Sequence, residues 1–191
     1  RREQGRRPNE VRKSVQLTRW FYIGLQEVSN REFREFRPQH TSGAEKYRGL
    51  AADNHPVVML SWEDAAAFGN WLSDKEVLEH DYIKEAGKFV LIDPLSTGYR
   101  LPTEAEWAWV ARYRGGRGEQ RFPWGTAMPP IENSGNYADA AAINSVPNVL
   151  LGYNDGNALA ADVASFTPNS PGVYDLGGNV AEWIHDNSSL A

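Results

Sequence analysis

The sequence contains no cysteine among its 191 residues. That absence excludes disulfide bonds, thiolate metal ligands and a cysteine nucleophile within these residues. No run of apolar residues approaches the roughly eighteen that a membrane-spanning helix needs, so we expect no membrane span in the chain. The first residues, from Arg1 onward, are too polar to resemble a secretory signal peptide.

The apolar fraction, by contrast, is sufficient for a hydrophobic core. Apolar residues make up 41% of the chain, and it contains seven Trp and eight Tyr. Trp and Tyr suit a core crossed by loops, because each carries a polar N–H or O–H that must find a partner when it is buried. The length and composition predict one domain that spans residues 1–191.

Charge is unevenly spread along the chain. Residues 1–37 hold ten of the 20 Lys and Arg but only five of the 25 Asp and Glu. The basic N-terminal arm, with Arg1, Arg2, Arg6, Arg7, Arg12 and Lys13, fits either a contact with nucleic acid or a solvated strand edge, where Lys and Arg discourage pairing with another strand. We favour the strand edge and expect no nucleic-acid partner, because the acidic remainder of the chain would repel phosphate.

Two segments have the composition of β-strands. Residues 11–24 alternate apolar and polar positions before an aromatic run, and residues 56–60 form a short apolar run. The apolar residues 89–92 favour an inserted hairpin, which we expect to be closed by Asp93 and Pro94.

Three short helices are predicted from capping boxes, in which a Ser or Thr and an acid three residues later exchange hydrogen bonds. The boxes begin at Ser29, Ser61 and Thr103, and apolar residues recur at helical spacing after each one. We expect four of the aromatic side chains on these helices to share one core: Phe33, Phe36, Trp71 and Trp107.

From residue 115 onward the composition changes. The chain becomes rich in Gly, Asn, Pro and Asp and loses any helical period. Such a length without regular structure needs a physical reason in a compact domain. A bound metal ion can hold loops that have little core of their own. Disorder is the alternative, but aromatic motifs such as the one at residues 122–124 argue against it.

Several motifs in a fixed order carry a resemblance to a known family. They are Glu-Val-Ser-Asn at 27–30, Pro-Val-Val at 56–58, Asn-Trp-Leu-Ser at 70–73, Tyr-Arg-Leu-Pro-Thr-Glu-Ala-Glu-Trp at 99–107, Phe-Pro-Trp-Gly at 122–125 and Gly-Val-Tyr-Asp-Leu-Gly-Gly-Asn-Val-Ala-Glu-Trp at 172–183. The series resembles the formylglycine-generating-enzyme, or sulfatase-modifying-factor, family over nearly the whole chain. The resemblance implies an α/β (α+β) fold of the C-type-lectin-like kind, with little regular secondary structure and long loops.

In the enzymatic members of that family, a cysteine pair after a Gly-Gly-Ser motif binds copper and oxidises a substrate cysteine to formylglycine. Neither feature occurs here, so we expect a domain incomplete at both ends, with no catalytic residue and no formylglycine-generating activity of its own. One interpretation is a binding or scaffold module for a protein or small-molecule ligand that the sequence does not identify. The alternative is a fragment of a protein-modifying oxidoreductase whose cysteines lie outside these residues.

The resemblance also implies calcium, at two sites. The second site would use the Asp175 and Glu182 carboxylates with the carbonyls of Gly178 and Val180, and the first the side chains of Asn136 and Asp155 with the carbonyls of Tyr137 and Asn157. Hard cations prefer such oxygen ligands, although Asp, Asn and Gly in these positions are equally typical of turns. Calcium sites of modest affinity favour an extracytoplasmic setting.

Other candidate sites are weaker. The four histidines show no metal-ligand spacing, so zinc and iron are not indicated. Glu104 and Glu106 could form a carboxylate pair, but acids in a first helical turn favour the helix dipole and indicate a structural role. The tryptophans 107, 109 and 183 could line a ligand site, although packing in the core is the stronger expectation.

Overall fold

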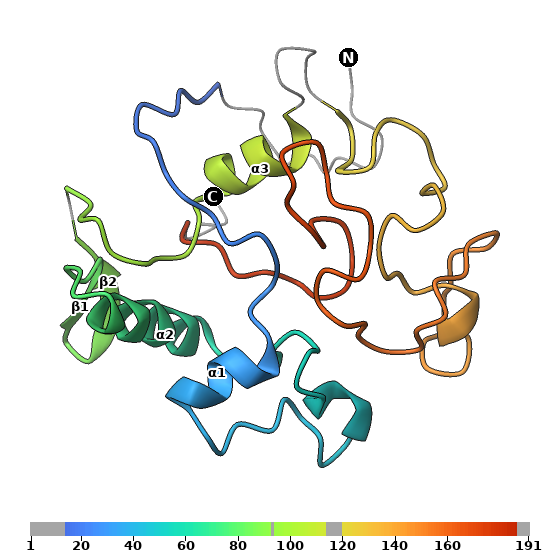
Figure 1. The fold of residues 1–191 in the computed structure, drawn as a ribbon, viewed down its shortest axis with the longest axis horizontal. Coiled ribbons are helices and arrows are strands. Elements are labelled where there is room, and N and C mark those ends of the chain that lie inside the picture. Colours follow the sequence, from blue (N-terminus) through green and yellow to red (C-terminus); the bar gives the residue numbers. More distant parts are fainter. Residues whose placement is uncertain (1–13, 93, 114–119, 187–191) are drawn as a thin grey trace.

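The computed structural model describes residues 14–92, 94–113 and 120–186 of the chain. Most of this length lies in turns and loops (Figure 1). The helices are α1 (Asn30–Phe36), α2 (Trp62–Lys75) and α3 (Glu104–Arg112), the strands are β1 (Tyr82–Glu85) and β2 (Lys88–Leu91), and the 3₁₀ turns are η1 (Arg48–Ala51) and η2 (Ala140–Ala142). The predicted low content of regular secondary structure is confirmed.

Each of the three α-helices begins at the capping box predicted from the sequence. The side chains of Ser29, Ser61 and Thr103 accept hydrogen bonds from the backbone N–H three residues on. In return, the acid at that third position accepts the backbone N–H of the capping residue. Both exchanges satisfy backbone groups that a helix end leaves unpaired, which explains where these short helices start.

The strands form one antiparallel hairpin, in which Tyr82 pairs with Leu91 and Glu85 with Lys88. Ala86 and Gly87 make the turn, and both have positive φ angles of 49° and 82°. A two-residue turn of this kind matches the natural twist of a hairpin. The hairpin predicted around residues 89–92 is therefore present, but its turn precedes the apolar run. The prediction that Asp93 and Pro94 close the hairpin is wrong for Pro94, which lies outside the turn. Asp93 lies outside the described residues.

The two predicted strands outside the hairpin are not formed. Residues 11–13 lie outside the described part of the chain, and 14–24 run as an extended segment without a strand partner among the described residues. The segment still has the two faces that its alternating sequence predicts. Phe21 and Ile23 pack inward, while Trp20 is 99% exposed. An extended backbone becomes a strand only when a neighbour completes its hydrogen bonds.

The apolar run at residues 56–60 makes only an isolated bridge. Pro56 pairs with Ser29, and the Val57 N–H donates to the Val28 carbonyl at 2.8 Å. Pro56 itself has no N–H to offer, and Met59 takes a positive φ of 58°, which turns the chain away from a continued strand. The segment instead fixes the entry of α1.

Aromatic side chains form a core between α1 and α2. The rings of Phe33, Phe36, Phe68 and Trp71 form one connected set, in which contacting rings have centroids 5.2 to 5.9 Å apart. Phe33 is almost completely buried. Three of the four aromatic residues predicted to share a core do so.

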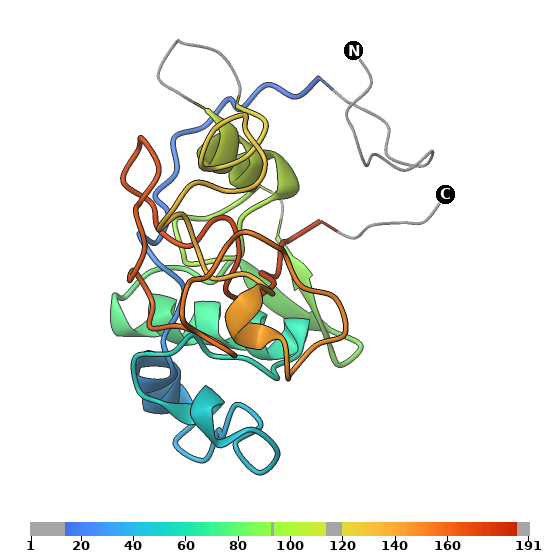
Figure 2. The same ribbon diagram turned by 90° about the vertical axis from the view of Figure 1, so that its right-hand side faces the viewer.

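Trp107 is the exception and packs in a second core. Its ring lies against a cluster built by Val110 and Ala111 of α3 with Val173 and Leu176 of the C-terminal loops. Figures 1 and 2 place α3 in the upper part of the molecule and α1 in the lower part. The capping pattern that located α3 says nothing about which partner its inner face contacts, and the prediction of one shared core is wrong for Trp107.

The long C-terminal loops are tied to the N-terminal half by single hydrogen bonds. The Tyr174 N–H donates to the Leu25 carbonyl, and the His185 N–H to the Pro102 carbonyl, each at 2.8 Å. The Asn169 side chain donates to the carbonyl of Val110 at the end of α3. Residues 120–186 therefore lie against one side of the helical half as a set of anchored loops, drawn from yellow to red in Figure 2.

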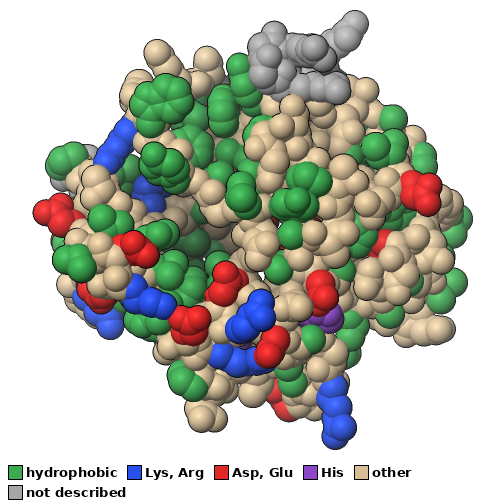
Figure 3. Space-filling model, viewed as in Figure 1, with side chains coloured by type: hydrophobic (Ala, Val, Ile, Leu, Met, Phe, Trp, Pro, Cys, Tyr) green, Lys and Arg blue, Asp and Glu red, His purple; other side chains and the backbone are tan. Residues whose placement is uncertain are grey.

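The surface on the face drawn in Figure 3 mixes acidic and basic side chains in its lower part, with many apolar side chains exposed above them. Exposed aromatic residues include Tyr22, Trp109 and Trp183. The expectation that Trp109 and Trp183 pack in the core is therefore wrong, since they are 45% and 49% exposed. Across the described residues, the structure contains no helix with the length and apolar character needed to cross a bilayer.

Candidate cation site

Two of the C-terminal loops meet at glycines. A Cβ atom on Gly178 would lie 2.2 Å from the carbonyl oxygen of Asn136, and one on Gly177 would lie 2.8 Å from the ring of Trp124. Gly178 also has a positive φ of 124°. Only glycine allows this close approach and this backbone conformation. As a result, the loop of the second predicted calcium site lies directly against Asn136 and Tyr137 of the first.

Asp175 is a buried carboxylate with one unsatisfied oxygen. Its side chain is only 7% exposed as a residue, and its Oδ2 accepts the Ala164 N–H at 2.6 Å. Its Oδ1 is fully buried, and no donor from the described residues reaches it. Burial raises the pKa of Asp175 above its usual value. A buried oxygen without a partner is energetically costly, and a cation is one means of satisfying it.

Glu182 is the second carboxylate of this loop. Its carboxylate accepts a hydrogen bond from the indole Nε1 of Trp107. Glu182 is exposed as a residue, yet desolvation of its carboxylate is the main cause of its raised pKa. The charge of Asp175 raises the pKa further, whereas the hydrogen bond from Trp107 opposes the shift.

Glu27 is a third carboxylate in the same region, and the sequence did not single it out as a site residue. Burial, followed by the charge of Asp175, raises the pKa of Glu27 to about 8. Hydrogen bonds from Asn179 and from the Val180 N–H work in the opposite direction. Glu27 belongs to one of the motifs that carried the family resemblance. An acid just before a helix is usually a surface residue, however, so its position in the sequence did not indicate a role in the site.

The residues of the second site fit a hard cation on the evidence of the orphaned Asp175 oxygen and the raised carboxylate pKa values. Side chains alone are insufficient, because the described residues contain no group of three or more His, Asp and Glu arranged to hold a metal ion. Backbone carbonyls would have to complete the ligand set. That requirement matches the roles predicted for the carbonyls of Gly178 and Val180.

The residues of the first predicted site are also brought together. The Asp155 carboxylate accepts the Tyr137 N–H at 2.7 Å and the Asn157 N–H at 2.8 Å. The amide of Asn136 donates from Nδ2 to the Leu159 carbonyl at 2.6 Å. Oδ1 of Asp155 also accepts the Asn157 side-chain amide at 3.4 Å. Oδ2 accepts one donor among the described residues, the Tyr137 N–H, so its second lone pair remains for an ion.

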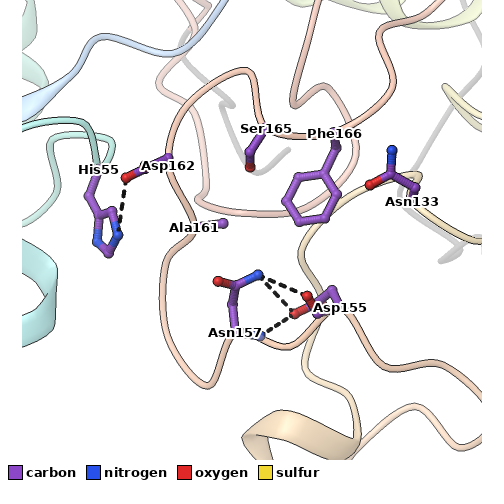
Figure 4. Close-up of a pocket in the computed structure, with 8 residues that line it drawn as sticks. All are labelled: His55, Asn133, Asp155, Asn157, Ala161, Asp162, Ser165 and Phe166. Atoms are coloured by element: carbon purple, nitrogen blue, oxygen red, sulfur yellow. Dashed lines mark hydrogen bonds and ion pairs between the residues drawn. The ribbon is translucent and has the colours of Figure 1, made fainter.

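A polar pocket of about 410 Å³ adjoins the first predicted site (Figure 4). Nε2 of His55 lies 3.5 Å from Oδ1 of Asp162, and Nδ1 of His55 is buried without a partner among the described residues. The pocket is lined by His55, Asn133, Asp155, Asn157, Ala161, Asp162, Ser165 and Phe166. None of the three tryptophans considered as a ligand wall lines it.

Of the two other acidic candidates, Glu106 has the predicted structural role. The Glu106 carboxylate forms a two-point ion pair with the Arg100 guanidinium at 2.6 and 2.7 Å, and it also accepts the Thr103 N–H. Glu104 is exposed, and its backbone N–H donates to Asp186. The Glu106 carboxylate thus stabilises the start of α3, whereas Glu104 contributes there through its backbone N–H.

Comparison with known proteins agrees with this architecture. Residues 2–189 match the model of the sulfatase-modifying factor enzyme 1-like domain. The chain belongs to this family. It is 37% identical over 133 residues to the formylglycine-generating enzyme of Thermomonospora curvata, an alignment that covers 70% of this chain and 34% of that enzyme. It is 32% identical over 132 residues to the inactive C-alpha-formylglycine-generating enzyme 2 of Mus musculus, covering 67% of this chain and 32% of the relative.

Solved structures share the fold. The variable protein 1 of Treponema denticola matches with a TM-score of 0.63 and 24% identity, over 86% of this chain and 63% of that protein. CarF matches with a TM-score of 0.56 and 27% identity, over 87% and 68% of the two chains. The predicted fold of this family, mixed in helix and strand with little regular secondary structure, is thereby confirmed. The chain spans about a third of the length of the formylglycine-generating enzymes that it matches.

Proposed function

We propose that this chain is a calcium-stabilised member of the family that acts as a binding or scaffold module and does not generate formylglycine by itself. The observation that supports it most is the buried, unpaired Oδ1 of Asp175, a carboxyl whose charge raises the pKa of both Glu182 and Glu27. An ion at this position would satisfy that oxygen and neutralise acids that otherwise repel each other.

Calcium suits these residues better than magnesium. Calcium accepts six to eight oxygen ligands at flexible angles, including backbone carbonyls, whereas magnesium requires a tight octahedron and retains its waters. The ligands available here are carboxylates and carbonyls on irregular loops, with positive φ angles at Asp175 and Gly178. Desolvation raises the pKa of both Asp175 and Glu182, which indicates that the charged loop is unfavourable without an ion.

The absence of cysteine supports the non-enzymatic part of the proposal. The oxidation that the family resemblance implies requires thiols, and these 191 residues contain none. The family also includes a relative whose own name describes it as inactive. The pocket beside His55 and Asp162 offers a polar surface for a protein or small-molecule ligand, and a calcium site of modest affinity fits an extracytoplasmic setting.

Thermal unfolding of metal-free protein tests the calcium site. A ligand that binds only the folded state stabilises it by RT ln(1 + [L]/Kd), about 2.7 kcal/mol at a hundredfold excess over Kd. For a chain of this size we expect calcium to raise Tm by roughly 5–10 °C. Asp175→Asn should remove most of this gain, whereas the exposed control Glu104→Gln should retain it. A Tm that does not respond to calcium or chelator would refute the proposal.

The 37% identity to a formylglycine-generating enzyme favours a second candidate. In this alternative the chain is part of an oxidoreductase whose cysteines are supplied from outside these residues. Incubation of the 191-residue chain with a sulfatase-motif peptide, copper and oxygen separates the two. We expect the peptide mass to remain unchanged, and conversion of its cysteine to formylglycine by this chain alone would overturn the proposed function.

A further inference from the structure

We propose that Asn179 and Glu27 are positioning residues that couple the two predicted cation sites, so that an ion bound at one raises the affinity of the other. This inference rests on the proposed calcium function. It concerns residues that bind no ion themselves and act through the hydrogen bonds they make to both loops.

Asn179 lies between the two carbonyls predicted for the second site, those of Gly178 and Val180. Its side chain points away from that loop into contacts with other segments. Oδ1 of Asn179 accepts the Ala161 N–H at 2.9 Å and Nδ2 of Asn136 at 3.1 Å. The backbone N–H of Asn179 donates to the Asn136 carbonyl at 2.8 Å. One residue of the second site is therefore bonded twice to a predicted ligand of the first.

The contact to Asn136 fixes which end of its amide is available to an ion. Nδ2 of Asn136 is held by two acceptors, Oδ1 of Asn179 and the carbonyl of Leu159. Asn136 is almost completely buried, so its amide has little freedom to rotate. With the nitrogen fixed in this way, the oxygen Oδ1 is the end left to serve as a ligand.

Glu27 in turn fixes the amide of Asn179. The Asn179 Nδ2 donates to Oε2 of Glu27 at 2.7 Å, and the Val180 N–H donates to Oε1 at 3.4 Å. Glu27 thus holds a side chain and a backbone group of the second-site loop at once. The resulting relay runs from Glu27 through Asn179 to Asn136, and each step is a hydrogen bond between specific atoms.

The backbone provides a second connection between the sites. Gly178 approaches the Asn136 carbonyl so closely that a Cβ atom would lie 2.2 Å from it. An ion that draws the Gly178 and Val180 carbonyls inward must therefore also set the position of Asn136. When two sites bias a shared arrangement, each ligand changes the affinity for the other by the same factor.

Calcium titration calorimetry on metal-free protein measures this coupling. The affinity of the first site is compared between the wild-type protein, in which the second site fills, and Asp175→Asn, in which it does not. We expect the first site to bind roughly tenfold more weakly in Asp175→Asn, within the usual range of coupling between sites. In an Asn179→Ala background, which keeps the backbone contact but loses the side-chain bonds, the same comparison should give a ratio well below tenfold.

Asn154→Ala is the matched control. Among the described residues, the Asn154 side chain accepts a hydrogen bond only from the Gly156 N–H, within its own exposed loop, so its removal should leave the tenfold ratio intact. If Asn179→Ala does not fold, Glu27→Gln provides the second variant and should reduce the ratio. Amide hydrogen exchange at Ala161 in Asp155→Asn adds an independent readout, since calcium at the second site alone should slow it.

The outcomes separate this inference from the calcium proposal. A wild-type protein that binds no calcium overturns both. Binding of two independent ions, or of one ion only, overturns the coupling and leaves the calcium function in place. A tenfold ratio that persists in Asn179→Ala overturns the role of Asn179.

Discussion

The indole N–H of Trp107 in α3 donates a hydrogen bond to the carboxylate of Glu182, 75 residues further along the chain. Trp107 also packs against the core formed by Val110, Ala111, Val173 and Leu176. One side chain thus performs two tasks, since it fills a core and holds a predicted calcium ligand. A helix identified by its capping box is in this way connected to the site that the loops build.

Trp107→Phe should separate these two tasks. Phenylalanine preserves aromatic packing but cannot donate to Glu182, so the carboxylate loses the group that orients it. Loss of such an outer partner typically lowers metal affinity 10- to 100-fold, and we expect calcium binding to weaken by about that factor. Isothermal titration with calcium measures the change.

Trp62→Phe is the matched control for this variant. The Trp62 Nε1 donates to the carbonyl of Ile184 and not to a predicted ligand. Its replacement should reduce stability by a comparable amount and leave calcium affinity unchanged. Equal losses of affinity in the two variants would show that Trp107 acts only through general packing.

The helices could be predicted from sequence because their signals are local. A Ser or Thr and an acid three residues apart determine a helix start almost independently of the rest of the fold, and all three such predictions are confirmed. The division of aromatic residues between two cores could not be predicted in the same way. Whether Trp107 meets Phe33 or Val173 depends on how the loops return, and no local pattern encodes that.

For the candidate site, too, the sequence predicted what lies within one motif but not which distant residues join it. Asp175 and Glu182 share one motif, so the sequence could place them together, and the structure adds the glycine contacts that press the loop onto Asn136. Glu27 comes from the opposite end of the chain and joins the site only through tertiary folding. Likewise, residues 14–24 have a strand-like alternation, but strand formation depends on a partner that alternation does not specify.

The buried ion pair of Arg100 and Glu106 yields a stability prediction. Their side chains are only 14% and 10% exposed, and two hydrogen bonds join them. Removing one partner of a buried pair leaves the other charge uncompensated, which costs about 3–5 kcal/mol. Glu106→Gln should lower the free energy of unfolding by that amount in a denaturant titration at pH 7.

Glu35→Gln is the surface control for this measurement. Glu35 pairs with Lys75 at 2.7 Å, but both side chains are about half exposed, so its removal should cost less than about 1 kcal/mol. Burial acts to raise the pKa of Glu106, but the hydrogen bonds from Arg100 and Thr103 outweigh it and lower that pKa. The contribution of the pair is therefore present above the ordinary pKa of 4.5 and lost as the pH falls through the lower folded value. Similar losses in the two variants at pH 7 would contradict this account.

Glu27 should make the protein less stable as the pH rises, which is opposite to the effect of Glu106. Its pKa is raised from 4.5 to about 8 in the folded protein, chiefly by burial and then by the charge of Asp175. Between these two values the unfolded chain releases its proton while the folded protein retains it. In chelator, stability should therefore be highest near pH 4.5 and decline as the pH rises toward 8, at roughly 1.4 kcal/mol per pH unit as an upper limit.

Calcium should remove this decline, because a divalent cation stabilises the ionised carboxylates that burial disfavours. Urea unfolding at pH 5, 6.5 and 8, with chelator or with calcium, measures the effect. Glu27→Gln carries no ionisable group at this position, so its stability in chelator should vary less with pH than that of the wild type. Glu104→Gln alters an exposed acid in the first turn of α3 and should leave the wild-type dependence intact. If wild type and Glu27→Gln decline alike, or if calcium leaves the slope unchanged, the shifted Glu27 carboxyl is not the cause.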